Sequence, residues 1–184
     1  MKRIFIAIKI DPGETLLKMI SSFKSGLKMG NIKWTNPENI HITLAFLGDT
    51  DDALLKAINT TLKEKCEGFG RFDLVLKGAG VFKNLSDPRI IWTGIETSEK
   101  LAIFNELVKS ALIKASVKIE DRPFKPHLTL GRIKHLKPAD GLKELINKYK
   151  DVELQKVPVN EVIIYESILL KTGPVYDPLT RLIL

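Results

Sequence analysis

The sequence predicts an α+β fold with two lobes that enclose one cleft, and three observations support this. Helical and strand patterns alternate over 184 residues without a Pro-rich or Gly/Ser-rich linker. Strands come in pairs between helices, which favours antiparallel sheets. Two similar tetrapeptides, beginning at His41 and His127, lie about half the chain apart. We therefore expect residues 1–184 to form a single two-lobed domain with pseudo-twofold symmetry, in which antiparallel sheets line a central cleft and helices pack outside.

The first half of the chain shows apolar spacing typical of strands and helices in turn. The isoleucines at even positions of residues 3–10 form one strand face, and Phe5, Ala7 and Lys9 lie on the other. Asp49, Thr50 or Asp51 can cap the helix that follows the first tetrapeptide. Strands are predicted at 3–10, 32–35 and 40–47, and helices at 14–28 and 49–65.

The second half repeats this alternation. Ser98 is a suitable cap for a helix whose apolar stripe recurs at helical spacing. Glycines and a turn at 84–88 separate the first two strands of this half. Strands are predicted at 72–77, 89–95, 127–133, 152–157, 161–170 and 180–184, and helices at 98–115 and 139–149.

Composition narrows the function classes. The formal charge of +7 favours an anionic partner such as a phosphate, although the lysines are scattered along the chain. The single cysteine, Cys66, cannot form an internal disulfide and lies at helical spacing, as a structural thiol does. No apolar run is long enough for a membrane span, and the first residues do not resemble a signal peptide. We expect a cytoplasmic protein without a membrane partner.

The two tetrapeptides are His41-Ile42-Thr43-Leu44 and His127-Leu128-Thr129-Leu130. In a strand, residues two apart share a face, so each motif places an imidazole beside a hydroxyl. Two imidazoles near their ordinary pKa can supply one proton donor and one proton acceptor at neutral pH. Phosphodiester hydrolysis needs both, and hydroxyls can donate hydrogen bonds to the phosphate.

Other kinds of site fit the sequence less well. A metal site needs further ligands, but no HxH, HxxxH or CxxC occurs. The GxSxG elbow, the P-loop and GxGxxG are also absent. We therefore expect neither a metal nor a cofactor. A lone histidine in a strand is usually structural, but the repeated motif argues against that interpretation here. His135 has no such pattern and is interpreted as a solvated loop residue.

The motif regions IHITLAFLGD and KPHLTLGR resemble those of the two-histidine (2H) phosphoesterase superfamily. They are most similar to its RNA 2′,3′-cyclic phosphodiesterase branch, historically called 2′-5′ RNA ligases. The resemblance extends to RIFIAIKI, IKWTNPENIHITLAFLG, RIIWTGI, IIYESIL and GPVY, and so covers most of the chain.

This resemblance implies a metal-independent enzyme that opens the 2′,3′-cyclic phosphate at RNA ends to a 2′-phosphate. It implies that His41 is the general acid, which protonates the departing 3′-oxygen, and that His127 is the base that activates water. Thr43 and Thr129 would hold the phosphate. The nearly symmetric motifs do not by themselves separate acid from base. We expect the protein to act as a monomer on RNA ends.

Further residues match the family pattern less directly. Arg132 matches an arginine on the phosphate side of the family's site. Strict alternation, however, places it on the face opposite His127, unless the strand ends or bulges near Gly131. Phe5 matches an aromatic residue near the substrate, where base stacking and core packing are both open. Trp34, Trp92 and Tyr165 could line the cleft, but strand aromatics more often belong to the core.

Three other functions remain open. The same site could join RNA ends through a 2′-5′ linkage, or open the cyclic phosphate of a small nucleotide. Product analysis separates these from RNA-end hydrolysis. A non-catalytic module that binds RNA ends is the alternative from another class, and tight binding without turnover would identify it.

Overall fold

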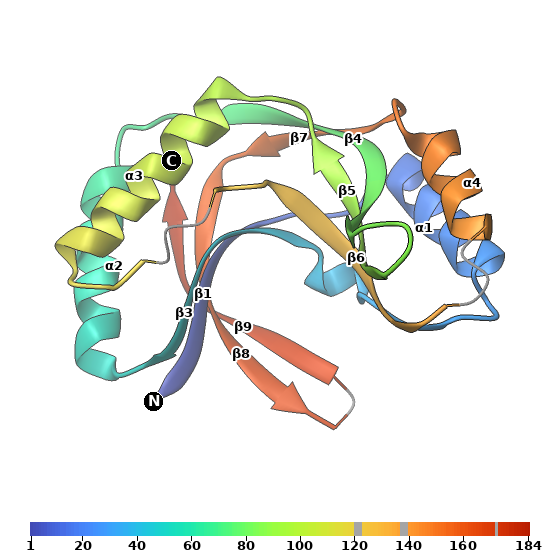
Figure 1. Cartoon of the computed structure of the whole chain (residues 1–184). Helices are drawn as coiled ribbons and strands as arrows, with labels where there is room; N and C mark the ends of the chain where they lie inside the picture. The colour runs from blue at the N-terminus through green and yellow to red at the C-terminus, as the bar shows by residue number, and fades with distance from the viewer. Residues whose placement is uncertain (120–122, 137–139, 172) are drawn as a thin grey trace.

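The computed structural model describes residues 1–119, 123–136, 140–171 and 173–184, and within them the strands form one strongly curved sheet (Figure 1). All the strand pairs are antiparallel, as predicted for an α+β fold. The strands are β1 (Lys2–Lys9), β2 (Asn31–Trp34), β3 (His41–Thr50), β4 (Phe72–Lys83), β5 (Pro88–Ile95), β6 (His127–His135), β7 (Glu153–Val159), β8 (Glu161–Leu170) and β9 (Gly173–Ile183).

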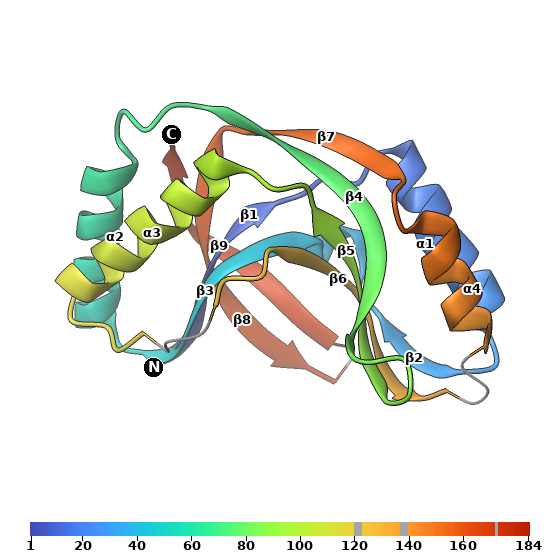
Figure 2. The same cartoon turned by 45° about the horizontal axis from the view of Figure 1, so that its top comes forward.

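The described residues form four α-helices, which lie outside the sheet in a pair at each end of the arch (Figure 2). They are α1 (Glu14–Gly26), α2 (Asp52–Cys66), α3 (Glu99–Lys114) and α4 (Asp140–Tyr149). Helix α1 packs against α4, and α2 packs against α3. Each pair therefore joins one helix from the first half of the chain to one from the second half.

The strand order is β7-β4-β5-β6-β3-β1-β8-β9, with β2 beside β6. The two motif strands are neighbours near the middle, where Ile42 pairs with Leu128. On each side of this pair comes a strand from the same half of the chain, β1 beside β3 and β5 beside β6. The units β1, α1, β3, α2 and β5, α3, β6, α4 are thus related by a pseudo-twofold axis near Ile42 and Leu128.

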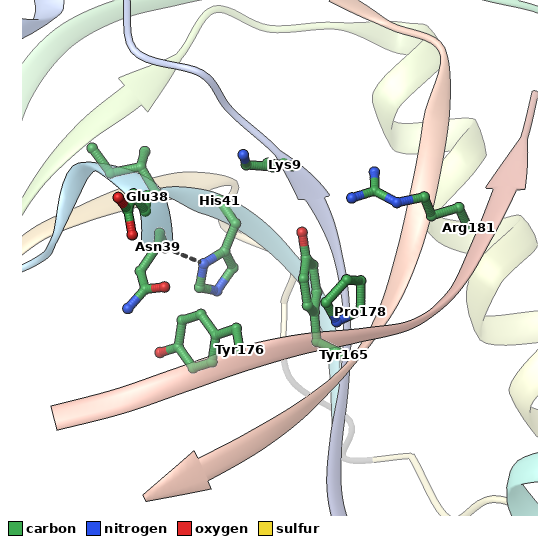
Figure 3. A pocket seen from close by; sticks show the side chains of 9 residues that line it. Lys9, Glu38, Asn39, His41, Tyr165, Tyr176, Pro178 and Arg181 are labelled. Atoms are coloured by element: carbon green, nitrogen blue, oxygen red, sulfur yellow. Dashed lines mark hydrogen bonds between the residues drawn. The ribbon is translucent and has the colours of Figure 1, made fainter. Parts of the chain in front are cut away.

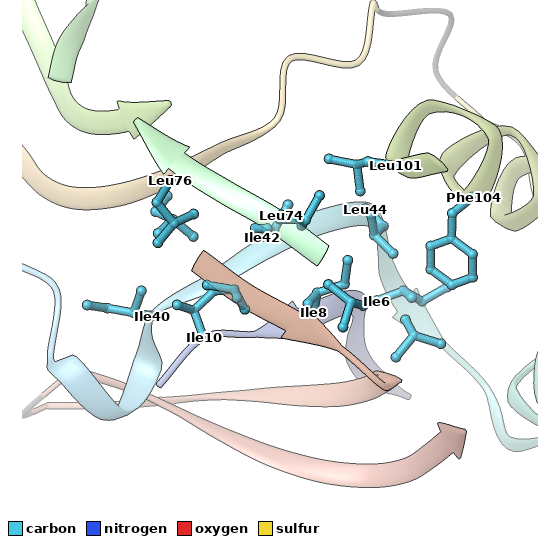
Figure 4. Packing of buried hydrophobic residues seen from close by; sticks show 14 of the residues in the cluster. Ile6, Ile8, Ile10, Ile40, Ile42, Leu44, Leu74, Leu76, Leu101 and Phe104 are labelled. Atoms are coloured by element: carbon cyan, nitrogen blue, oxygen red, sulfur yellow. The ribbon is translucent and has the colours of Figure 1, made fainter. Parts of the chain in front are cut away.

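The main hydrophobic core fills the sheet face that the helices cover, and it draws on both halves (Figure 4). Ile4, Ile6 and Ile8 lie in this core, as their alternation predicted. Their neighbours on the other strand face, Phe5 and Ala7, belong to a second small cluster. The sheet therefore has one covered face and one face that is free to carry a site.

Two predicted helix starts are confirmed, with a small shift. Asp51 caps α2, because its Oδ1 accepts a hydrogen bond of 2.8 Å from the Leu54 amide. The predicted start at residue 49 was too early, since β3 continues to Thr50. Ser98 caps α3 through a 3.2 Å bond from the Leu101 amide. The predicted first residue of the fourth helix, 139, lies outside the described residues.

Two strands are much longer than predicted. Strand β4 continues beyond residue 77 because Gly78, at φ +74°, forms a bulge there and the pairing with β5 resumes at Ala79. Strand β9 begins at Gly173 and not at the predicted residue 180. Proline is tolerated in β9 because this strand forms an edge of the sheet. No helix among the described residues is long and apolar enough to cross a membrane.

Candidate active site

The register of the central strands brings the two motifs together on one face. Ile42 and Leu128 are paired, and both side chains are fully buried in the main core. In an antiparallel pair this register puts His41 opposite Thr129, and Thr43 opposite His127. The four motif side chains therefore lie on the face opposite the main core, in the pseudo-symmetric arrangement that the sequence predicted.

Each tetrapeptide ends at a β-bulge. One step along β1, from Ala7 to Ile6, corresponds to two steps along β3, from Thr43 to Ala45, so Leu44 is the extra residue. Leu130 is the extra residue in β6 in the same way, between the partners of Trp92 and Ile91. A bulge of this kind reverses the alternation of the strand beyond it.

The bulge at Leu130 corrects the prediction that Arg132 faces away from His127. Ile90, Trp92 and Gly94 alternate along β5 and share a face, and their partners on β6 are Arg132, Thr129 and His127. Arg132 thus lies on the face of the motif residues, which is the condition stated for it to reach a phosphate. The bulge at Leu44 places Phe46 at the equivalent position of β3, as the partner of Phe5.

Both imidazoles are oriented by the backbone in the same way. Nδ1 of His41 lies 2.7 Å from the carbonyl oxygen of Asn39, and Nδ1 of His127 lies 2.7 Å from that of Lys125. A carbonyl oxygen only accepts hydrogen bonds, so each Nδ1 carries a proton and donates it. The chemistry of each ring is therefore left to Nε2, which can accept a proton or, when protonated, donate one.

The carbonyl beneath His41 is itself fixed by the surrounding chain. Asn39 ends a short 3-10 helix, Pro37–Asn39, whose preceding residue Asn36 accepts a hydrogen bond from the Glu38 amide. The Asn39 side chain donates a 3.0 Å bond from Nδ2 to the Pro174 carbonyl of β9. One residue thus joins the turn that orients His41 to the edge strand of the sheet.

Aromatic rings surround His41. The ring centroid of Phe5 lies 5.0 Å from that of His41, and Tyr176 meets the imidazole edge-on at 5.2 Å. Tyr165 stacks on Phe5 at 5.1 Å. Phe5 is only 2% exposed and supports the imidazole from within the second cluster. Base stacking by Phe5 stays a prediction.

His127 has its own aromatic neighbours. Phe82 meets its ring edge-on at 4.9 Å, and Phe82 also contacts Trp92 at 5.3 Å. Trp92 pairs with Thr129 in the sheet, so the indole lies on the face of the motif residues. The indole packs over Gly80, where a Cβ would come within 2.3 Å of the ring. Glycine at position 80 thus makes room for the aromatic wall beside His127.

Electrostatics distinguish the two halves of the site. Burial lowers the pKa of His41, the hydrogen bond to the Asn39 carbonyl partly opposes this, and the charge of His127 lowers the pKa further. The neutral form of His41 is thus favoured, and protonation of both rings together is disfavoured. Burial raises the pKa of the Tyr176 hydroxyl, and the charges of Arg132 and Arg3 oppose this. The charge of Arg132 therefore reaches the aromatic wall beside His41.

The remaining candidate residues are distributed as follows. Trp34 packs against the main core, whereas Tyr165 lies in the second cluster on the face of the motif residues. His135 is exposed as expected, but it is the last residue of β6 and not part of a loop. Burial raises the pKa of the Cys66 thiol to about 11, which fits a structural thiol. Among the described residues, His, Cys, Asp and Glu do not gather in threes that could hold a metal ion.

Several residues around the site were missed by the sequence analysis. Phe46 and Phe82 look like ordinary strand residues until the bulges and the strand pairing are known. Tyr176 lies in the part of β9 that was not predicted as a strand. Lys9 was assigned to a strand face, but its pairing with His41 depends on register. Only the alternation around Lys9 could have suggested its position, because Lys9 shares the strand face of Phe5.

This geometry defines a class of site in which two imidazoles and two hydroxyls face one space, with a guanidinium on the same sheet face. Comparison with known families gives the same class. The profile of the family described as LigT like Phosphoesterase matches residues 8–92 and 95–176. The chain belongs to this LigT-like phosphoesterase family.

Similar curated proteins carry one name. The chain is 34% identical to an RNA 2′,3′-cyclic phosphodiesterase of Methanothermobacter thermautotrophicus, with 95% of this chain and 94% of that protein covered. Proteins of the same name from Methanocaldococcus jannaschii and Thermotoga maritima are each 35% identical. These matches cover 95% and 96% of this chain, and 96% and 92% of those proteins, respectively.

Solved structures agree on the fold. A crystal structure of a Thermus thermophilus protein superposes with a TM-score of 0.78 at 24% identity, covering 99% of this chain and 97% of that one. The crystal structure of E. coli LigT complexed with 3′-AMP superposes with a TM-score of 0.75 at 24% identity, covering 100% of this chain and 98% of that one. The curved antiparallel sheet with outer helices is therefore the fold of these proteins.

Proposed function

We propose that this protein hydrolyses 2′,3′-cyclic phosphates at RNA ends to 2′-phosphates, using one histidine as acid and the other as base. The observation that carries the proposal is the Ile42–Leu128 pair, whose register places an imidazole and a hydroxyl from each half on one face. The name shared by the curated relatives supports the substrate.

The proposed reaction displaces the 3′-oxygen in line. Nε2 of His127 accepts a proton from water as the water oxygen forms a bond to phosphorus. The bond from phosphorus to the 3′-oxygen breaks, and His41 gives its Nε2 proton to that oxygen. A 2′-phosphate and a free 3′-hydroxyl result, and the proton gained by His127 can return to His41 through solvent. Acid and base steps of this kind contribute about 10²- to 10⁴-fold each.

Three further residues stabilise the phosphate in this proposal. The hydroxyls of Thr43 and Thr129 donate to its non-bridging oxygens, and Arg132 supplies positive charge on the same face. Together with the two imidazoles, these groups supply acid, base and charge stabilisation, so the proposed reaction uses no metal. Activity in excess EDTA tests that part.

The reverse assignment of acid and base is the second candidate, and the pKa of His41 favours it. The lowered pKa favours the neutral form of His41 in the free protein, which is the form that a base needs. A bound cyclic phosphate carries a negative charge, however, which raises the pKa of an adjacent imidazole and allows the acid role. A substrate with sulfur in place of the 3′-oxygen separates the two. A thiolate leaves without protonation, so this substrate rescues the variant that lacks the acid and leaves the other inactive.

The test of the function itself is product analysis on an oligonucleotide that ends in a 2′,3′-cyclic phosphate. We expect a 2′-phosphate end and no joined product in excess EDTA. A 2′-5′ linked product would instead identify a ligase, and turnover confined to cyclic mononucleotides would identify a small-nucleotide phosphodiesterase. Tight binding of the 2′-phosphate end without turnover would identify a binding module.

A further inference from the structure

A pocket lies beside His41 (Figure 3). Strand β3 runs between β6, which carries His127, and β1, which carries Lys9. The pocket is a cavity of about 130 Å³ between β1, the end of the 3-10 helix and the hairpin of β8 and β9. It is lined mainly by Lys9, Glu38, His41, Tyr165, Tyr176 and Arg181.

The walls of this pocket are mainly aromatic and positively charged, and Glu38 contributes one carboxylate. Tyr165 and Tyr176 supply aromatic surface, and the hydroxyl of Tyr165 points toward Lys9 and Arg181 (Figure 3). The two cations lie across the pocket from Tyr176. Aromatic surface next to positive charge is the combination with which proteins bind single-stranded nucleic acids, where bases meet rings and phosphates meet cations.

Both cations are available to a phosphate. Nζ of Lys9 lies 2.9 Å from Oδ1 of Asp11, and Arg181 pairs with Glu161. The Lys9 side chain is 36% exposed and that of Arg181 is 50% exposed. Ion pairs with this exposure contribute little to stability, so a phosphate can replace the carboxylate at small cost.

The stereochemistry of the proposed reaction puts the RNA chain on this side. In an in-line displacement, the attacking water and the departing 3′-oxygen lie on opposite sides of phosphorus. With His41 as the acid, the 3′-oxygen faces His41, away from the water that His127 activates. The ribose carbon that holds this oxygen continues through C4′ and C5′ to the preceding phosphodiester. That phosphodiester therefore leaves the reaction centre on the side of the pocket.

We propose that this pocket is a subsite for the RNA chain, in which Lys9 and Arg181 bind the phosphodiester on the 5′ side of the cyclic phosphate. Tyr176 then faces the last nucleoside. The proposal rests on the proposed function, with His41 on the leaving-group side. It makes the pocket the feature that distinguishes an RNA end from a cyclic mononucleotide, which has no phosphate at this position.

Three substrates test the subsite. They are adenosine 2′,3′-cyclic phosphate, the same compound with a methyl phosphodiester on its 5′-oxygen, and the dinucleotide with a terminal cyclic phosphate. We expect the added phosphodiester to raise kcat/KM roughly 10-fold, as a charge-assisted hydrogen bond does. The dinucleotide should show at least the same gain. Equal kcat/KM for all three substrates would overturn the proposal without any variant.

The double variant Lys9→Gln, Arg181→Gln tests the two cations. We expect the ratio of kcat/KM between the methyl phosphodiester compound and the plain mononucleotide to fall close to 1. The dependence of log kcat/KM on log salt for the dinucleotide should become shallower by roughly 0.7, the value for one neutralised phosphate on a single strand. A ratio that stays at the wild-type value would overturn the assignment.

The matched control is Lys109→Gln, Lys114→Gln on α3. These lysines also pair with surface carboxylates, Glu106 and Glu64, so the control removes the same charge elsewhere. It should keep the wild-type ratio and salt dependence. If the wild type turns over none of the substrates, the proposed function fails. The subsite is then tested by affinity for a dinucleotide 2′-phosphate against 2′-AMP, and equal affinity would overturn it.

Discussion

The two motif-bearing halves of the sheet are alike at the reacting groups and different around them. Each half has a His-x-Thr-Leu tetrapeptide that ends at a bulge, and an imidazole held by the carbonyl two residues before it. Beyond the bulge, however, one half presents Phe46, which is 73% exposed, and the other presents Arg132.

The strand partners of the histidines differ as well. Lys9 pairs with His41, whereas Gly94 pairs with His127. The shared features alone would allow either histidine to act as the acid and the other as the base. Each half supplies the same imidazole, held by a carbonyl, and the same hydroxyl. The unshared residues can fix which side receives the ribose. The residues that the two halves share thus supply the acid and the base. The residues that they do not share decide which histidine faces the ribose.

Removing either imidazole should have the largest effect. We expect His41→Ala and His127→Ala each to lower kcat/KM for a cyclic phosphate end by about 10²- to 10⁴-fold, because each deletes one proton transfer. Steady-state kinetics on an oligonucleotide measures this. His135→Ala, which removes the exposed third histidine, is the control and should retain wild-type activity. Full activity in either motif variant would mean that the halves do not act as a pair.

Arg132→Gln tests the clearest asymmetry. We expect a loss of roughly 10²-fold in kcat/KM, since a preorganised donor near developing charge contributes this much. Arg71→Gln, at an exposed position before β4, is the matched control and should leave kcat/KM unchanged. Exchanging the two residues, Phe46→Arg with Arg132→Phe, should leave activity as low as in the single variant. Recovery of activity in the exchanged protein would show that the arginine does not have to lie on the same half of the site as His127.

The hydroxyls should contribute less and to a similar extent. Thr43→Val and Thr129→Val keep the shape but remove one donor, so we expect each to lower kcat/KM roughly 10-fold. Thr60→Val, which removes a hydroxyl bonded within α2, serves as the control. A loss of kcat/KM in only one of the two threonine variants would show that the two hydroxyls do not contact the phosphate equally.

The smallest effect concerns the proton affinity of His41. Its pKa in the free protein should lie below the ordinary value of about 6.5, because burial disfavours the charged ring. NMR titration of the imidazole measures this. Tyr176→Ala opens one side of the ring and should raise the pKa, and Tyr149→Ala, in α4, should not. A His41 pKa that Tyr176→Ala leaves unchanged would show that Tyr176 does not contribute to the burial of this imidazole.

The same shift links stability to pH. The unfolded chain binds the His41 proton at a higher pH than the folded chain does. The contribution of His41 to the free energy of unfolding is therefore complete at a pH above the ordinary pKa of histidine. It declines as the pH falls below that pKa. Urea unfolding of the wild type and of His41→Gln at several pH values should show a smaller acid-side decline in the variant.

The sequence predicted the parts of the site that follow from local alternation. His41 with Thr43, and His127 with Thr129, needed only strand periodicity, and the isoleucine face of β1 followed from the same rule. Arg132 could not be placed, because a bulge becomes visible only when the residues of two paired strands are counted against each other. The aromatic wall formed by Phe5, Tyr165 and Tyr176 also depends on pairing between strands distant in sequence.

The long-range pairing of β1 has a consequence for the order of events during synthesis. Strand β1 leaves the ribosome before the other strands of the sheet, but in the finished sheet it lies between β3 and β8. Strand β9 closes the pocket beside His41. Tyr165, Tyr176 and Arg181 all come from the last strands of the chain. Such distant contacts form slowly, since a long loop must close first. The nascent chain therefore holds both histidines well before it can complete the wall beside His41, and a chain released before residue 173 lacks β9 altogether.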